Sequence, residues 1–239
     1  MKSILDRNSW LRRASRWLVA SVGLAVIVLS IPTARADIID ISISDPNPAL
    51  SGFTGPYANL NINLTSSTTA TITFSSLING GYTYLMGSQG AAALNVNGTY
   101  TLGSVSAVNS IAGFNTPLFT GNNPGNEDGW GNFNLALDFH GGFPDAATWI
   151  RFTLTDTSGT WASASNVLTA NANGADAAAH AFACLNPCTR TEGAALSGFA
   201  ANGGTNSGVT STSVPEPATL ALLGLSLTGL GFSRRRQQR

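Results

Sequence analysis

A histidine beside two carboxylates is the first candidate for chemistry in this chain of 239 residues. His140 follows an alternating apolar segment and stands close in sequence to Asp138 and Asp145. A histidine paired with a carboxylate is the core of many hydrolase sites, so this segment is the candidate catalytic site. The adjoining Gly141 and Gly142 are equally typical of a turn. Because no G-x-S-x-G or H-E-x-x-H motif accompanies the pair, we expect no enzymatic activity and no cofactor.

The only two cysteines, Cys184 and Cys188, lie in the segment CLNPC. In an oxidising compartment such a pair favours a small disulfide-closed loop. A zinc site is the alternative, but it needs two further ligands, and the chain has only His140 and His180 to offer. A redox motif normally separates its cysteines by two residues, and here there are three. We therefore expect a disulfide and no metal site.

His180, the second histidine, lies in the segment AAAHAFAC. Alternation in a strand would place His180, Phe182 and Cys184 on one face. This pattern predicts a packed or edge histidine rather than a catalytic one.

Oxygen-bearing side chains are concentrated in GNNPGNEDGWGN, residues 121–132. Calcium prefers such ligands, and extracellular modules carry weak sites of this kind. In an EF-hand alignment, however, Pro124 stands at the first ligand position and Leu135 at the last. We therefore predict a solvated turn, with a calcium site as the alternative. The side chains concerned are Asn122, Asn123, Asn126, Glu127 and Asp128.

Aromatic side chains offer one more kind of site, because their rings stack on the apolar faces of sugars. Trp149 is expected to face outward from its strand, whereas most tryptophans of a β-sandwich belong to the core. Carbohydrate binding is therefore an alternative function and not the preferred one. The candidate rings are those of Trp130, Trp149, Trp161, Tyr82 and Tyr84.

The elements that must position these groups are predicted to be β-strands. Apolar and polar residues alternate in the segments 58–65, 69–74, 132–139 and 149–156. Turn signals such as Asn79-Gly80-Gly81, Asn97-Gly98 and Ser158-Gly159 stand between the strands. The fold class is therefore all-β, with an antiparallel β-sandwich over residues 37–200. The predicted inward residues are Leu60, Ile62, Leu64, Ala70, Ile72, Phe74, Phe133, Leu135, Leu137, Phe139, Ile150, Phe152 and Leu154.

The charge of the middle of the chain excludes one class of partner. Residues 37–213 carry ten acidic side chains against only Arg151 and Arg190, a formal charge of −8, and contain no lysine. Nucleic-acid binding requires clustered lysine and arginine to displace counterions from phosphates. We therefore expect no nucleic-acid partner.

The first 36 residues have the three parts of a secretory signal peptide. A basic start precedes the apolar run 17–31, and the small residues Ala34 and Ala36 follow. This pattern predicts cleavage after Ala36, with Asp37 as the first residue of the mature chain. An uncleaved N-terminal anchor is the alternative. The basic residues of the first part are Arg12, Arg13 and Arg16.

The C-terminal part begins with a predicted flexible linker, residues 201–213, which has no apolar periodicity. A helix over the uncharged run 218–232 would be about 22 Å long at 1.5 Å per residue, short for a bilayer. Basic residues after an apolar segment keep that end in the cytoplasm. We therefore predict a short transmembrane helix with a cytoplasmic basic anchor, which consists of Arg234, Arg235 and Arg236.

Three adjoining pieces, V-P-E-P-A at 214–218, L-A-L-L-G-L at 220–225 and R-R-R at 234–236, resemble the PEP-CTERM sorting signal of Gram-negative bacteria. The resemblance implies recognition by an exosortase, a membrane-embedded cysteine transpeptidase, followed by removal of the anchor. It also implies release or attachment at the surface of a bacterium that makes exopolysaccharide. The motif residues are Val214, Pro215, Glu216 and Pro217.

An ordinary C-terminal anchor is the alternative to a sorting signal. Glu216 separates the two interpretations, because a charge held between two prolines suits a protease groove and serves no anchoring purpose. We expect an exported, non-enzymatic protein of the cell surface or exopolysaccharide matrix, held in the inner membrane before processing. Its expected partners are the exosortase and, as a further candidate, exopolysaccharide. The alternatives are a carbohydrate-binding module and, less favoured, a secreted hydrolase.

Overall fold

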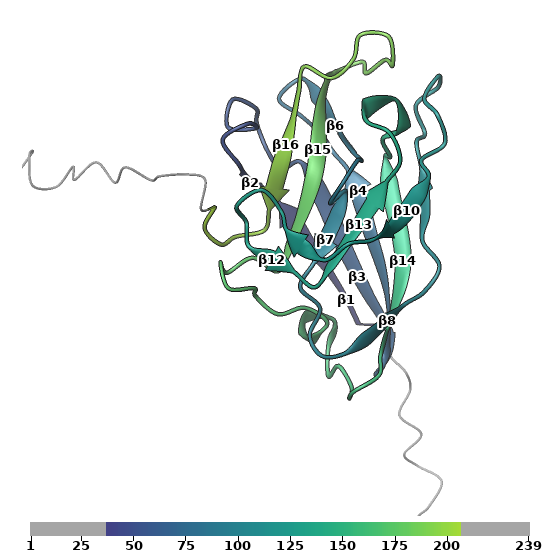
Figure 1. Ribbon diagram of the computed structural model, residues 1–239, viewed down its shortest axis with the longest axis vertical. Coiled ribbons are helices and arrows are strands. Elements are labelled where there is room, and N and C mark those ends of the chain that lie inside the picture. Colours follow the sequence, from purple (N-terminus) through teal and green to yellow (C-terminus); the bar gives the residue numbers. More distant parts are fainter. Residues whose placement is uncertain (1–36, 207–239) are drawn as a thin grey trace, which may run out of the picture.

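The computed structural model describes residues 37–206, which form an all-β fold (Figure 1). All paired strands run antiparallel, which confirms the predicted fold class. The predicted signal peptide and short transmembrane helix lie outside the described residues. Within residues 37–206, no helix has the length and apolar character needed to cross a membrane.

One sheet is built from the alternating strands found in the sequence. Its order is β1-β3-β4-β14-β8, and β9 pairs with another part of β14. Ile72 of β4 lies opposite both Ile62 of β3 and Phe152 of β14, so apolar side chains align across three strands. The strands are β1 (Asp37–Ile43), β3 (Ala58–Ser66), β4 (Thr69–Ser76), β8 (Tyr100–Leu102), β9 (Ser106–Val108) and β14 (Trp149–Asp156).

The second sheet has the order β10-β13-β7-β15-β16-β2, and β6 pairs with β15 and with the short β5. A separate two-stranded sheet joins β11 and β12. The 3₁₀ helices η1 (Phe143–Asp145) and η2 (Ala164–Asn166) lie in connections. The strands are β2 (Asp45–Pro46), β5 (Ile78–Asn79), β6 (Tyr82–Met86), β7 (Ala92–Leu94), β10 (Phe119–Asn122), β11 (Gly125–Asn126), β12 (Asn132–Phe133), β13 (Leu135–Phe139), β15 (Ala177–Leu185) and β16 (Leu196–Ala201).

The two large sheets share one core. Figure 1 shows β7, β13, β15 and β16 in front of β1, β3 and β4, and one buried cluster contains residues of both sheets. Ile62, Phe74 and Phe152 come from the first sheet, and Leu94 and Leu137 from the second. All thirteen residues predicted to point inward are buried. Burying such side chains is the main source of stability in a fold of this kind.

The predicted turn at Asn79-Gly80-Gly81 joins β5 to β6. Gly80 and Gly81 have φ values of 56° and 83°, the pair of positive angles that a two-residue hairpin turn requires. A Cβ on Gly80 would also come 2.8 Å from Cβ of Thr54. Glycine is therefore needed there for both conformation and space.

The segment 132–139 differs from the single strand that its alternation predicts. Asn134 separates β12 from β13, and its side-chain amide pairs with the backbone of Val96: Oδ1 accepts from Val96 N at 2.8 Å, and Nδ2 donates to Val96 O at 2.7 Å. The side chain thus replaces strand pairing at this position. As a result, Phe133 packs in a second cluster with Trp130 and Ala136, away from Leu135.

The fold also extends past the predicted domain boundary at residue 200. Ala201 is the last residue of β16, and Oδ1 of Asn202 accepts hydrogen bonds from the backbone of Asp176 and Ala177 at 3.1 and 2.7 Å. Asn206 is buried and donates to the carbonyl of Asp128 at 2.9 Å. Residues 201–206 therefore belong to the domain, because asparagine side chains fix them where apolar periodicity is absent.

Candidate functional site

Four segments that are distant in sequence meet at a pocket of about 350 Å³, which we call the Glu127 pocket. The segments are the turn after β6, the loop between β11 and β12, strand β15 and strand β16. Its walls combine oxygen-bearing side chains with two rings. The lining residues are Ser88, Gln89, Asn126, Glu127, Asp128, His180 and Phe199.

Glu127 is the most unusual group of this pocket. Its side chain is only 7% exposed, and no hydrogen-bond donor of residues 37–206 reaches its carboxylate. It lies against Gly90, whose φ is +63°, and a Cβ there would come 2.1 Å from Oε2 of Glu127. Burial, together with repulsion by Asp138, raises the pKa of Glu127 to about 7. The group therefore changes charge near neutral pH.

His180 forms a wall of the same pocket. Its ring stacks on Phe199 with centroids 4.7 Å apart and planes inclined by 18°, and it also contacts the ring of Phe182. Nδ1 lies 2.9 Å from the carbonyl oxygen of Gly87, which assigns the proton to Nδ1. Burial lowers the pKa of His180, so the neutral form is favoured. The packed histidine predicted from alternation is what the structure shows.

The loop that carries Glu127 is held by hydrogen bonds. Within the loop, Gly129 N donates to Oδ1 of Asn126 at 2.9 Å, and Trp130 N donates to the carbonyl of Glu127 at 3.0 Å. Asp128 receives a hydrogen bond from Nδ2 of the buried Asn47. The predicted turn is thus present as a fixed feature of the fold, while residues 37–206 contain no group of three or more His, Cys, Asp or Glu side chains placed for a metal ion.

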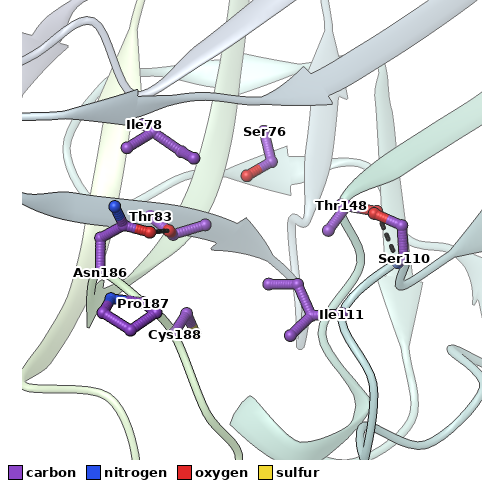
Figure 2. A pocket seen from close by; sticks show the side chains of 9 residues that line it. All are labelled: Ser76, Ile78, Thr83, Ser110, Ile111, Thr148, Asn186, Pro187 and Cys188. Atoms are coloured by element: carbon purple, nitrogen blue, oxygen red, sulfur yellow. Dashed lines mark hydrogen bonds between the residues drawn. The ribbon is translucent and has the colours of Figure 1, made fainter.

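A second pocket, of about 360 Å³, has a neutral lining (Figure 2). Figure 2 shows Ile78, Asn186 and Pro187 on one side and Ser110, Ile111 and Thr148 on the other. Two of its hydroxyls pair with neighbouring groups: Thr83 Oγ1 donates to Oδ1 of Asn186 at 3.3 Å, and Thr148 Oγ1 donates to the carbonyl of Val108 at 3.0 Å. The remaining lining residues are Ser76, Thr83 and Cys188.

The candidate catalytic pair of the sequence is not assembled. His140 is exposed, and no hydrogen bond of its ring to any group of residues 37–206 is formed. Oδ1 of Asp138 instead accepts from Gly90 N at 2.9 Å, and Oδ1 of Asp145 accepts from Nδ2 of Asn115 at 2.7 Å. The expected requirement of a hydrolase, a histidine oriented by a carboxylate, is therefore not met at His140.

The candidate sugar-binding rings do not form one outward surface. Trp130, Trp161 and Tyr84 are buried at 3%, 2% and 0% exposure, which corrects their inclusion among the candidates. Tyr82 is half-buried against Phe53. Trp149 is half-buried and lies under the guanidinium of Arg151, 5.4 Å from its ring centroid. The rings of Trp130 and Trp161 fill two apolar clusters of the domain, because a sandwich of this size needs large apolar side chains inside.

The sulfur atoms of Cys184 and Cys188 lie 2.07 Å apart, at bonding distance. Cys184 is fully buried and Cys188 nearly so, in a cluster with Leu85, Phe143 and Phe182. The geometry fits the predicted disulfide and leaves neither sulfur free as a metal ligand. The other residues proposed from the sequence, which are Ala34, Ala36, Val214, Pro215, Glu216, Pro217, Arg234, Arg235 and Arg236, lie outside the described residues.

Comparison with known proteins places a signal at the C-terminus. Residues 213–236 match the family model of the PEP-CTERM protein-sorting motif, which covers the motif, the apolar run and the basic residues identified in the sequence. No curated protein and no solved structure matches the chain. The sorting motif is that of an exosortase-targeted surface protein, exported as a membrane-anchored precursor and processed to the cell surface.

Proposed function

We propose, from the PEP-CTERM sorting motif at residues 213–236, that the chain is a non-enzymatic protein of the cell surface or exopolysaccharide matrix of a Gram-negative bacterium. An N-terminal signal peptide exports it, and an exosortase cleaves it at or near Pro215-Glu216-Pro217. Cleavage converts a precursor tethered to the inner membrane into a mobile or surface-linked domain. The motif match is the observation that carries this proposal.

Features of the described domain support the extracellular part of the proposal. Cys184 and Cys188 are placed for a disulfide, which persists in oxidising compartments outside the cytoplasm. Ten acidic side chains against Arg151 and Arg190 give residues 37–213 a formal charge of −8, which favours solubility and repels other polyanions. Within residues 37–206, Asp138 and Asp145 accept hydrogen bonds from Gly90 and Asn115 and not from His140, which disfavours the hydrolase alternative.

The proposal is tested by the mass of the mature protein from its native host. We expect wild type to have lost residues 1–36 and the segment beyond the Pro-Glu-Pro motif, and Glu216→Ala to keep its tail. Glu192→Ala is the matched control, because Glu192 is an exposed acid of the described domain and is expected to leave processing unchanged.

Two results would contradict the proposal. If wild type and Glu216→Ala both retain Arg234 to Arg236 and both partition with membranes, the C-terminus is only an anchor. If both lose the tail to the same extent, the Pro-Glu-Pro motif does not direct the cleavage.

A further inference from the structure

The side chain of Glu127 is buried without a hydrogen-bonding or cationic partner among residues 37–206. Buried carboxylates are normally paired with a cation or held by several donors, because removing a charge from water is unfavourable. Glu127 is 7% exposed and receives no hydrogen bond from residues 37–206. It also lines a pocket of about 350 Å³ that is open to solvent species. The side chain of Glu127 thus borders a pocket that has room for a cationic partner.

The groups around the carboxylate of Glu127 disfavour its ionised form unless a cation binds beside it. Asp138 of β13 repels it and raises its pKa, and Asp128 follows it in the same loop. His180 of β15 lines the pocket in a form that burial keeps neutral, and its Nδ1 is engaged with Gly87. The titratable neighbours are therefore two carboxylates and a neutral imidazole.

Neither arginine of the described domain pairs with Glu127. The guanidinium of Arg151 lies over Trp149 in the first sheet, while Arg190 donates to Oδ1 of Asn115 at 3.0 Å. These are the only basic side chains, apart from the histidines, in residues 37–206. Residues 37–206 therefore offer no cation to the ionised form of Glu127, and a counter-ion for that form has to come from outside this part of the chain.

We propose that the Glu127 pocket binds the primary ammonium group of a small ligand, with Glu127 as its counter-ion. The stacked rings of His180 and Phe199 supply an apolar wall for the carbon skeleton next to the ammonium, and aromatic faces attract cations. Asn126, Gln89 and Ser88 add hydrogen-bond acceptors for the N–H groups. A volume of about 350 Å³ is that of a small-molecule site.

An organic cation suits the pocket better than a metal ion. Calcium requires six to eight oxygen ligands and usually several carboxylates. The described residues contain no group of three or more potential metal-binding His, Cys, Asp or Glu side chains, and Asp128 already accepts a hydrogen bond from Asn47. The rings of His180 and Phe199 would also supply no oxygen ligand to calcium. Calcium chloride is therefore titrated beside the amine as the competing occupant.

Binding is linked to the ionisation of Glu127. An aliphatic amine has a pKa near 10 and stays cationic from pH 5 to 8, so the pH dependence in this range comes from the pocket, chiefly from the carboxylate of Glu127. With the pKa of Glu127 at about 7, the ionised fraction grows as pH rises. If only the ionised form binds, the affinity increases about 30-fold from pH 5.5 to pH 8.

The experiment is isothermal titration calorimetry of the full-length chain in a non-ionic detergent with n-butylamine as the probe. We expect binding that strengthens about 30-fold between pH 5.5 and pH 8. n-Butanol, a neutral analogue of similar shape, should not bind. Glu127→Gln should weaken butylamine binding at pH 8 by at least about tenfold and remove its pH dependence. Glu192→Gln, which removes an exposed carboxylate elsewhere, should behave as wild type.

Further probes identify the source of the ammonium group. Glucosamine binding that depends on Glu127, without binding of N-acetylglucosamine, would support the proposal and assign the ammonium to an amino sugar. Binding of butylamine without glucosamine would also support it and assign an aliphatic amine. The proposal is overturned if Glu127→Gln binds butylamine as wild type does, or if butanol binds equally well. Absence of amine binding at pH 8, with or without binding of calcium, overturns it too. None of these outcomes depends on whether the C-terminus is cleaved.

Discussion

Trp161 donates its indole N–H to the backbone carbonyl of Asn97 at 2.9 Å, whereas the indole N–H of Trp130 has no partner in the described domain. Both rings are almost fully buried, at 2% and 3% exposure, but they belong to different clusters. Comparing Trp161 with Trp130 therefore separates the contribution of a buried ring to stability from that of its hydrogen bond.

We predict that Trp161→Phe destabilises the domain more than Trp130→Phe does. Both changes remove similar ring volume, but only the first also removes a hydrogen bond, and the difference should be about 1 kcal/mol. Urea unfolding of the two variants, followed by circular dichroism, measures it. Equal losses of unfolding free energy would mean that the bond of Trp161 to Asn97 contributes nothing net.

The second prediction concerns the pH dependence of stability. The pKa of Glu127 is raised from 4.5 to about 7 in the folded protein, so its folded form holds its proton more tightly than the unfolded chain does. The protonated side chain of Glu127 therefore contributes to the free energy of unfolding a part that is fully present below pH 4.5 and is lost as pH rises through 7. Glu127→Gln should therefore match wild type at pH 4.5 and be more stable at pH 8, by up to about 3 kcal/mol.

Urea unfolding at several pH values between 4.5 and 8 tests this prediction, with Glu192→Gln as the exposed control. The contribution of His180 to stability has the opposite pH dependence. Burial lowers the pKa of His180, so its contribution is lost as pH falls. It is present in all three proteins and cancels from the difference. A stability difference that does not change with pH would refute the raised pKa.

The third prediction concerns the cysteines. A bond between Cys184 and Cys188 closes a loop of a few residues, which in the chain-entropy description stabilises the fold by about 2 kcal/mol. Replacing both by Ala should lower the free energy of unfolding by this amount or more, because Cys184 is buried in an apolar cluster. Thiol alkylation of the denatured protein should label both residues only after reduction. Labelling without reduction would show that the bond is absent.

The fourth prediction concerns proteolysis by trypsin, which cleaves after basic residues. Arg151 lies within β14, paired on both sides, with Thr73 of β4 opposite it and Ser106 of β9 on the other edge. Arg190 is exposed in the connection between β15 and β16. Within residues 37–206 we expect the first cut after Arg190 and none after Arg151 while the domain is folded. Mass spectrometry of a time course decides, and early cleavage at Arg151 would contradict the strand assignment.

Strand positions could be predicted where alternation alone determines them. In β3, β4 and β14, Leu60, Phe74 and Phe152 alternate with polar residues and are buried as expected. At Asn134 the same rule failed, because a side-chain amide took over the backbone pairing of Val96. Alternation describes apolar faces and carries no information about such polar substitution.

The Glu127 pocket could be predicted only in part. The sequence indicated that the loop 121–132 is rich in oxygen ligands, and it placed His180 on a packed face. It gave no indication that Ser88 and Phe199 meet Glu127, because they lie on segments that only the sheet order brings together. Nor could it show that Glu127 is buried, since the lack of a side chain at Gly90 makes the space.

If the chain is cleaved after Ala36 as predicted, the position of Asp37 constrains when β1 can join the sheet. Asp37 is paired with Leu64 as the first residue of β1, and its carboxylate accepts a hydrogen bond from Ala164 N at 2.6 Å. A peptidase that cuts after Ala36 must hold the residues on both sides of the bond in its own groove, where they cannot also belong to a sheet. Cleavage would then have to precede the pairing of β1 with β3, and until it occurs the outer edge of β3 would lack its partner strand.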